Sequence, residues 1–177
     1  MSIATNYSTV RAHPMSWIDD DVVIGEGVAI WQFASVVRGA VIGAYTSVGA
    51  SATVDGATVG VRCRIQSGAR LFAGCVVEDS VFIGPNAVVC NDYFPRNEKT
   101  GFYPDQYSDR PCVVIKHNAS IGANAVIMPG VTVGRLAMVP AGSKVTADVP
   151  DNHLWTSDGK CKPLKSGHVE RMRFARG

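Results

Sequence analysis

The stretch ASIGANAVIMPGVTVG, residues 119–134, places an aliphatic residue at every sixth position. Ile121, Ile127 and Val133 are these anchors. An α-helical face repeats its apolar positions every three to four residues, so a period of six excludes a helix and indicates short strands separated by bends. The stretch therefore predicts a chain that turns at regular intervals.

The same period extends through most of the chain. The interval between anchors is six within each run, except for a step of five between Val54 and Val59, where we expect a local kink. The count is interrupted once, between Val89 and Ile115. The nineteen anchors are Ile18, Ile24, Ile30, Val36, Ile42, Val48, Val54, Val59, Ile65, Leu71, Val77, Ile83, Val89, Ile115, Ile121, Ile127, Val133, Val139 and Val145.

A second column of residues, four positions after the anchors, is small or β-branched. If three hexads form one coil, large anchors fill the interior, small residues fit the corners, and each strand hydrogen-bonds to the coils on either side. The sequence thus predicts an all-β parallel β-helix of roughly six coils, about 4.8 Å apart. The column comprises Val22, Val28, Ala34, Ala40, Thr46, Ala52, Thr58, Cys63, Ala69, Cys75, Val81, Ala87, Ala119, Ala125, Val131, Ala137, Ser143 and Val149.

Composition limits the function classes. The 177 residues are 46% hydrophobic but only 8% aromatic, which indicates one aliphatic core. A net charge of +2 without a basic stripe predicts no nucleic-acid partner, and the lack of a long apolar run predicts no membrane span. Five cysteines without a CxxC pair, and no signal-peptide pattern at the start, favour a reduced, cytoplasmic protein.

The hexads divide the chain into three parts. We expect an N-terminal cap at residues 1–17, the β-helix at 18–150 with a loop insertion at 90–114, and a C-terminal cap or extension at 151–177. Leu154 and Trp155 are expected to close the open end of the core. A long insertion in a compact domain is usually functional, so the candidate site is sought there.

Three segments carry a resemblance: AIWQFASVVRGAVIG at 29–43, VFIGPNAVVCNDYFPRN at 81–97 and the stretch at 119–134. Together they resemble the left-handed β-helix acyltransferases with hexapeptide repeats. Within that family they are most similar to the N-acetyltransferases that act on dTDP-3-amino-3,6-dideoxyhexoses. The resemblance implies left-handed winding, a homotrimer with sites between subunits, acetyl-CoA as co-substrate and no metal.

The reaction implied is attack of a sugar amine on the thioester of acetyl-CoA, which requires amine orientation, oxyanion stabilisation and a proton acceptor. Asn91 matches the asparagine of the family motif and could hold the amine. Asp92 could accept a proton or cap the loop through an Asx turn. His117 is a second candidate base, with a solvated imidazole as the alternative.

Substrate contacts are expected from the insertion. Tyr93 and Phe94 could stack on a sugar or thymine, and Arg96 could pair with the pyrophosphate. The alternative is that these aromatic residues pin the loop to a neighbouring subunit. Trp31 would face the subunit cleft or pack at a corner, and Gln66 could make a further contact with the sugar that accepts the acetyl group.

Coenzyme A would lie along the prism axis. Ala123 and Ala141 are eighteen residues apart, so we expect them to face the same way on successive coils and, with Gly142, to expose backbone amides to the pantetheine arm. The alternative is that they are ordinary hexad fillers. Lys144 could approach the CoA phosphates. Ala147 stands where many relatives have lysine, which puts some phosphate contacts in doubt.

The sequence therefore predicts an acetyl-CoA-dependent N-acetyltransferase for nucleotide-linked amino sugars in surface glycan biosynthesis. A sugar O-acetyltransferase would need His117 as base. A non-catalytic β-helical scaffold has no evident need for the aromatic insertion. A γ-type carbonic anhydrase requires three converging histidines, and only His117 lies within the hexad wall.

Overall fold

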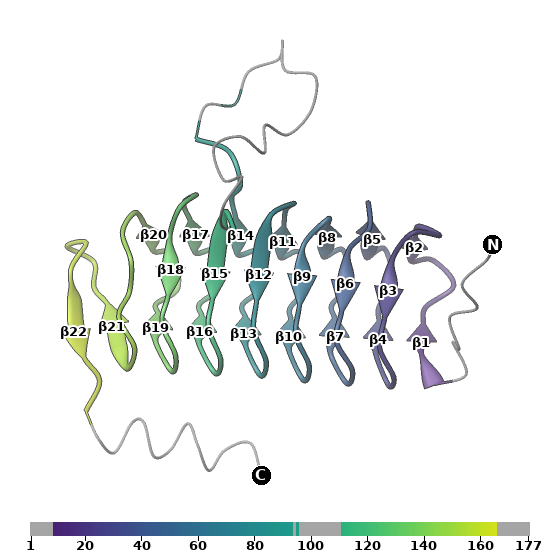
Figure 1. The fold of residues 1–177 in the computed structure, drawn as a ribbon, viewed down its shortest axis with the longest axis horizontal. Coiled ribbons are helices and arrows are strands. Elements are labelled where there is room, and N and C mark those ends of the chain that lie inside the picture. The colour runs from purple at the N-terminus through teal and green to yellow at the C-terminus, as the bar shows by residue number, and fades with distance from the viewer. Residues whose placement is uncertain (1–8, 94, 96–110, 166–177) are drawn as a thin grey trace.

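The computed structural model describes residues 9–93, 95 and 111–165, which form an all-β parallel solenoid (Figure 1). Twenty-two strands of two or three residues follow one another around a three-sided prism. No helix in the described part of the chain is long and apolar enough to cross a membrane. The hexad period thus produces the fold class that it predicts.

The strands form three sheets, and each of the first six coils contributes one strand to each sheet. Sheet A contains β1 (Arg11–Ala12), β4 (Ala29–Ile30), β7 (Ser47–Val48), β10 (Arg64–Ile65), β13 (Phe82–Ile83), β16 (Ser120–Ile121), β19 (Met138–Val139), β21 (His153–Trp155) and β22 (Cys161–Pro163). Sheet B contains β2 (Trp17–Ile18), β5 (Ser35–Val37), β8 (Thr53–Asp55), β11 (Arg70–Leu71), β14 (Val88–Val89), β17 (Val126–Ile127) and β20 (Lys144–Val145). Sheet C contains β3 (Val23–Ile24), β6 (Val41–Ile42), β9 (Thr58–Val59), β12 (Cys75–Val77), β15 (Val113–Ile115) and β18 (Thr132–Val133).

The chain runs from sheet A to sheet B to sheet C and back to sheet A in every coil. We name the three corners of the prism by the sheets that they connect: edge AB, edge BC and edge CA. Sheet B has seven strands, so the stack has about seven turns rather than the six expected. The anchors run from Ile18 to Val145, so their count leaves out β1 of the first turn, where Ala12 takes the anchor position, and Val149 of the last turn, which forms an isolated bridge with Val133.

The register of the strands confirms that three hexads make one coil. Ile30 pairs with Val48, eighteen residues later, whereas Val48 pairs with Ile65 after only seventeen. The difference is the residue missing from the five-residue step, which shortens the corner at Gly56. The residue missing from this turn is therefore confirmed, while the local kink stays a prediction.

The interior of the prism is aliphatic, as expected. Every anchor except Ile18 is buried, and Ile18 packs against the same core. The column of small residues is also buried at most corners, with one error: Thr58 is exposed, and Ala57 takes its place inside. The shortened corner shifts the inward position back by one residue.

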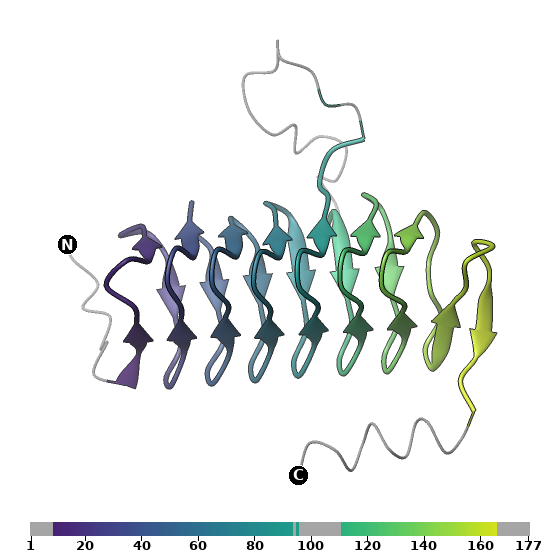
Figure 2. The ribbon, with the colours of Figure 1, turned by 180° about the vertical axis from the view of Figure 1, so that it is seen from behind.

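The stack is closed at one end by a hairpin, visible in yellow in Figure 2. β21 pairs in parallel with β19 and antiparallel with β22. Trp155 of β21 is buried against the core, while Leu154 is half-buried. The hairpin therefore covers the last coil of sheet A.

The interruption of the hexads lies at edge BC. β14 ends at Val89 and pairs with β11 and β17, and β15 begins at Val113 and pairs with β12 and β18. Ile115 aligns with Val77, so the coil resumes at the predicted anchor. The residues between these two strands are thus inserted without disturbing the stacking of the coils.

Candidate functional site

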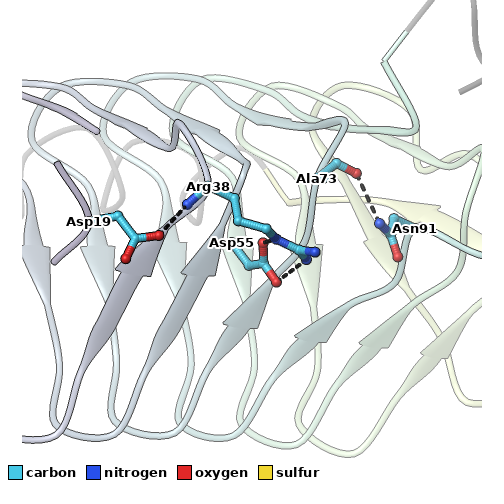
Figure 3. A network of polar contacts seen from close by, with 5 residues as sticks. All are labelled: Asp19, Arg38, Asp55, Ala73 and Asn91. Carbon is cyan, nitrogen blue, oxygen red and sulfur yellow. Dashed lines mark hydrogen bonds and ion pairs between the residues drawn. The ribbon is translucent and has the colours of Figure 1, made fainter. Parts of the chain in front are cut away.

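Asn91 lies at edge BC, where the chain leaves β14. Its Nδ2 atom donates a hydrogen bond to the carbonyl oxygen of Ala73 on the preceding coil, at 3.2 Å (Figure 3). A carbonyl oxygen only accepts, so this bond fixes which end of the amide faces the wall. The Oδ1 atom points away from Ala73, as an acceptor at the start of the insertion.

A charged pair occupies the same edge, with Arg38 three coils and Asp55 two coils before Asn91. The guanidinium of Arg38 donates through Nε and Nη2 to the carboxylate of Asp55, and the Arg38 backbone N–H donates to Asp19 Oδ2 at 3.1 Å (Figure 3). The hydrogen bonds to Asp55 raise the pKa of Arg38. Its charge is therefore already matched and is not open to a phosphate.

Asp92 and Tyr93 continue the chain beyond Asn91. Asp92 is half-buried, and Tyr93 is 45% exposed. The Tyr93 hydroxyl would lie 3.4 Å from a Cβ placed on Gly130, so the phenol ring rests against a glycine of the next coil at edge BC. Phe94 and Arg96 lie outside the described residues, and their expected contacts stay predictions.

His117 lies at a different corner, edge CA, directly after β15. Its backbone N–H donates to Glu78 Oε2 at 2.8 Å, and its Nε2 lies 2.9 Å from the Asn118 amide nitrogen. The Asn118 amide nitrogen can only donate, so in this arrangement it donates to Nε2, and the neutral, half-buried ring carries its proton on Nδ1. A base role would have the Asn118 oxygen accept Nε2–H, so that Nδ1 carries the lone pair.

Ala123 and Ala141 lie at the third corner, edge AB. The Gly142 N–H donates to the Ala123 carbonyl at 2.8 Å, and a Cβ on Gly122 would meet Ala141 N at 2.3 Å. The two alanines are therefore stacked on successive coils, as expected, but the Gly142 N–H is bonded within the wall and is not exposed to a ligand as predicted. Gly142 and the side chain of Lys144 are exposed, and a Cβ on Gly142 would touch nothing within 4 Å.

Trp31 and Gln66 also belong to edge AB. The Trp31 side chain is 55% exposed rather than packed at the corner, and Gln66 is half-buried two coils further along. Met15 and Phe33 are exposed beside Trp31, with the Phe33 N–H bonded to the Met15 carbonyl. An apolar surface thus lies at the N-terminal end of this edge.

The predicted site residues therefore fall on three separate edges of one chain. Asn91, Asp92 and Tyr93 lie at edge BC, and His117 lies at edge CA. Sheet C separates these two corners. The structure brings Trp31, Gln66, Ala123, Ala141 and Gly142 to one edge, AB, with Lys144 beside it on β20. It does not bring Asn91 and His117 together within a chain.

The cysteines offer no nucleophile. Burial raises the pKa of Cys63 to about 11, and its thiol donates to the Glu78 carbonyl at 3.0 Å. The neighbouring Cys112 thiol and burial raise the pKa of Cys75 further. A thiolate is the reactive form, so these buried side chains act as core packing, as predicted.

No group of three His, Cys, Asp or Glu side chains that could hold a metal ion occurs among residues 9–93, 95 and 111–165. Three of the four histidines are described, and they lie apart. His13 follows β1, His117 follows β15 and His153 begins β21. These positions do not offer the converging histidines of a zinc hydrase.

Sequence reasoning missed a groove on sheet A beside edge CA. It has a volume of about 680 Å³ and is lined by residues that include Arg11, Tyr45, Arg62, Arg64 and Phe82. Arg64 and Phe82 directly precede the anchors Ile65 and Ile83, so their outward direction was readable from the hexads. The hexads did not show that Arg62, at edge CA just before β10, joins these two side chains in the groove.

A parallel β-solenoid built on hexads, with one insertion at a corner, defines the class of hexapeptide-repeat proteins. Residues 4–98, more than half of the chain, match the family model described as the GMPPB C-terminal domain. Residues 112–147 match the model described as the bacterial transferase hexapeptide, with six repeats. The chain belongs to the family of the GMPPB C-terminal domain and carries the transferase hexapeptide repeat.

Curated relatives are longer than this chain. The bifunctional protein GlmU of Stenotrophomonas maltophilia is 32% identical over 164 residues, which is 88% of this chain and 32% of GlmU. A galactoside O-acetyltransferase of Lactococcus lactis is 34% identical over 76 residues, 43% of this chain and 36% of that protein. The chain therefore spans about a third of the length of these relatives.

A solved structure shares the fold. PerB from Caulobacter crescentus, determined in complex with CoA and GDP-perosamine, has a TM-score of 0.56 and 23% sequence identity. The match covers 87% of this chain and 57% of PerB. At this identity the likeness establishes the β-solenoid alone.

Proposed function

We propose that the protein is an acetyl-CoA-dependent N-acetyltransferase that acylates the amine of a nucleotide-linked amino sugar. The sugar class is a 3-amino-3,6-dideoxyhexose, carried by dTDP and destined for a surface glycan. The active form is a cytoplasmic homotrimer with its sites between subunits. Membership of a hexapeptide family and a fold shared with PerB, which binds CoA and GDP-perosamine, support this class of reaction.

The observation that carries the proposal is the anchoring of Asn91 at the insertion. Its Nδ2–H is bonded to the Ala73 carbonyl, so its Oδ1 points away from Ala73 and stays available as an acceptor. An acceptor fixed in this way can take a hydrogen bond from one N–H of an incoming amine. The nitrogen lone pair is then oriented toward a thioester carbonyl, which is a positioning contribution to catalysis.

The reaction proceeds by addition and elimination. The amine nitrogen bonds to the thioester carbon, a tetrahedral oxyanion forms, and the C–S bond breaks to release CoA thiolate. The nitrogen must lose one proton, and Nδ1 of His117 is the acceptor that we assign. Because His117 and Asn91 lie on different edges of one chain, the His117 of one subunit acts with the Asn91 of its neighbour.

Edge AB fits the donor. Ala123 and Ala141 leave little side chain between a ligand and the backbone, and the surface at Gly142 is open. Lys144 is exposed on β20, two residues after Gly142, and could meet a phosphate of CoA. We therefore assign the pantetheine arm to edge AB.

A second candidate is O-acetylation of a sugar. The galactoside O-acetyltransferase relative and the contact of the His117 ring with Asn118 favour it, because a hydroxyl needs a base more than an amine does. If the acceptor is a hydroxyl, His117→Asn should abolish turnover. If the acceptor is an amine, the same variant should keep part of its turnover at high pH, where the amine is already unprotonated.

The test is mass spectrometry of products formed from acetyl-CoA and a panel of dTDP-, UDP- and GDP-linked amino sugars. We expect one acetyl group to be added to a dTDP-linked amino sugar. Hydroxylamine treatment separates the two candidates, since it cleaves an acetyl ester and leaves an acetamide intact. If no sugar in the panel gains an acetyl group, the proposal is wrong.

A further inference from the structure

The sheet A groove has a floor of small side chains between long basic walls. Ala29 and Ser47 face outward on β4 and β7, between Arg11 on β1 and Arg64 on β10. Three coil spacings separate these two arginines, or about 14 Å along the prism. The small outward residues therefore create an elongated hollow rather than a flat wall.

The groove is positively charged. Arg11, Arg62 and Arg64 are all exposed, and in the described part of the chain no ion pair joins any of them to a carboxylate. Arg38 on edge BC is different, since Asp55 already binds it. The groove thus presents three guanidinium groups to an external anion.

The nearby carboxylates are engaged elsewhere. Glu26 accepts a hydrogen bond from the Tyr45 hydroxyl at 2.6 Å, and Asp79 accepts one from the Val61 N–H at 2.9 Å. The bond to Glu26 raises the pKa of Tyr45, so the phenol stays neutral. These acids position the walls of the groove and leave the arginines to a ligand.

Aromatic surface adjoins the charge. The Tyr45 ring lies directly over Gly27, where a Cβ would meet its Cδ1 at 2.6 Å, so only glycine allows this position. The ring is 58% exposed, and Phe82 is half-buried along the opposite side of Arg64. A planar base or a sugar ring can stack on such surfaces.

We propose that the sheet A groove binds a nucleoside diphosphate, with Arg62 and Arg64 on the phosphates and Tyr45 against the base or ribose. A planar guanidinium can donate two parallel hydrogen bonds to two phosphate oxygens. Arg62 and Arg64 are two residues apart and offer two such groups. Both the sugar nucleotide and coenzyme A contain a nucleoside diphosphate. The groove is assigned to that shared chemistry, and the test separates the two sources.

The groove adjoins the coil of His117. Ser80 lines it, and the coil that follows carries Asn118, whose N–H donates to the Asp79 carbonyl at 3.1 Å. A sugar attached to the diphosphate would therefore reach the His117 corner within about one coil spacing, 4.8 Å. This placement of the acceptor rests on the proposed function, whereas the binding of a nucleoside diphosphate does not.

The experiment is calorimetric titration of the full chain with dTDP, UDP and GDP, and separately with CoA and 3′,5′-ADP. Arg62→Ala and Arg64→Ala are each expected to weaken binding about tenfold or more. Arg70→Ala is the matched control, because Arg70 is also exposed and also precedes an anchor, but lies on sheet B. The melting temperature of each variant shows that the fold is kept, and Arg64→Lys should retain part of the affinity.

Loss of dTDP, UDP or GDP binding in the two groove variants, with Arg70→Ala unchanged, supports the groove as the acceptor site. Loss confined to CoA and 3′,5′-ADP supports the groove with the donor as its ligand. Unchanged affinities for every probe in both groove variants, or no binding of any probe, overturns the inference. Arginine-dependent binding without acetyl transfer to any sugar would instead leave the groove standing and refute the proposed function.

Discussion

Asn91 combines a structural hydrogen bond through Nδ2 with an acceptor oxygen, Oδ1, that points away from Ala73. Replacement by alanine removes both the Nδ2–H bond to Ala73 and the Oδ1 that we assign to the amine. We expect Asn91→Ala to lower turnover about tenfold or more, because amine positioning is lost. Steady-state kinetics with acetyl-CoA and the accepted sugar measure this.

The fold should survive that replacement, since one hydrogen bond of a half-buried side chain contributes only about 1 kcal/mol. The melting temperature and the oligomeric mass serve as controls. Unchanged kinetics would remove Asn91 from the mechanism, and a loss of activity that follows a loss of oligomer would reduce Asn91 to a structural residue.

Thr46 is the one buried polar side chain among the described residues. Its Oγ1 donates to the Gly60 carbonyl at 2.8 Å and accepts from the Cys63 N–H at 2.9 Å. Thr46→Val keeps the shape but leaves both backbone groups without this partner, so we expect a loss of about 1–3 kcal/mol in the free energy of unfolding. Urea unfolding measures the change.

Thr46→Ser is the matched variant, because it keeps the hydroxyl and removes only a methyl group. It should be destabilised less than Thr46→Val. The opposite order would mean that methyl packing, not the hydrogen bonds, determines the choice of threonine in this column of small residues.

At the scale of the element, the coil depends on backbone contact between corners. A Cβ on Gly43 would lie 2.5 Å from the Gly60 carbonyl carbon and 2.6 Å from Val61 N. Neither backbone can move without separating the coils, so we expect Gly43→Ala to destabilise the protein by more than about 3 kcal/mol. Thermal and urea unfolding test this.

Gly39→Ala is the control for that change. Gly39 has a φ of +66°, but a Cβ there would only approach Asp21 Oδ2 at 3.8 Å. Its cost should be limited to backbone strain, about 1–2 kcal/mol. Equal losses in the two variants would show that conformation, and not the close contact of coils, explains the glycines.

The elements were predictable because each hexad is a local rule. An anchor such as Ile65 is buried and pairs with the anchors before and after it, as the period requires. The wrong prediction that Thr58 points inward also has a local cause. When a corner is one residue shorter, any of its positions can be the missing one, and the period does not show which. Ala57 was the smaller residue and took the inside.

The whole molecule is less predictable than its elements. The hexad phase places Asn91 and His117 after different strands, and the order of the sheets then separates them by sheet C. The sequence analysis assigned both residues to one catalytic site, because distance along the sequence does not show which corner a residue occupies. The sheet A groove was missed for the same reason, since Arg11 joins it from three coils away.

The separation of Asn91 and His117 makes a prediction about assembly. If each site takes Asn91 from one subunit and His117 from the next, Asn91→Ala and His117→Ala chains are each strongly impaired alone but complement one another when mixed. When equal amounts of the two variants assemble at random, about a quarter of the interfaces between subunits contain both an intact Asn91 and an intact His117. About a quarter of the wild-type activity should therefore return. The measurement is turnover after the two variants are unfolded and refolded together, with the same variants refolded separately as the control. Light scattering should give three times the chain mass of 18.8 kDa for every sample. Mixtures no more active than the separate variants, although fully assembled, would place both residues in one subunit's site or remove His117 from it.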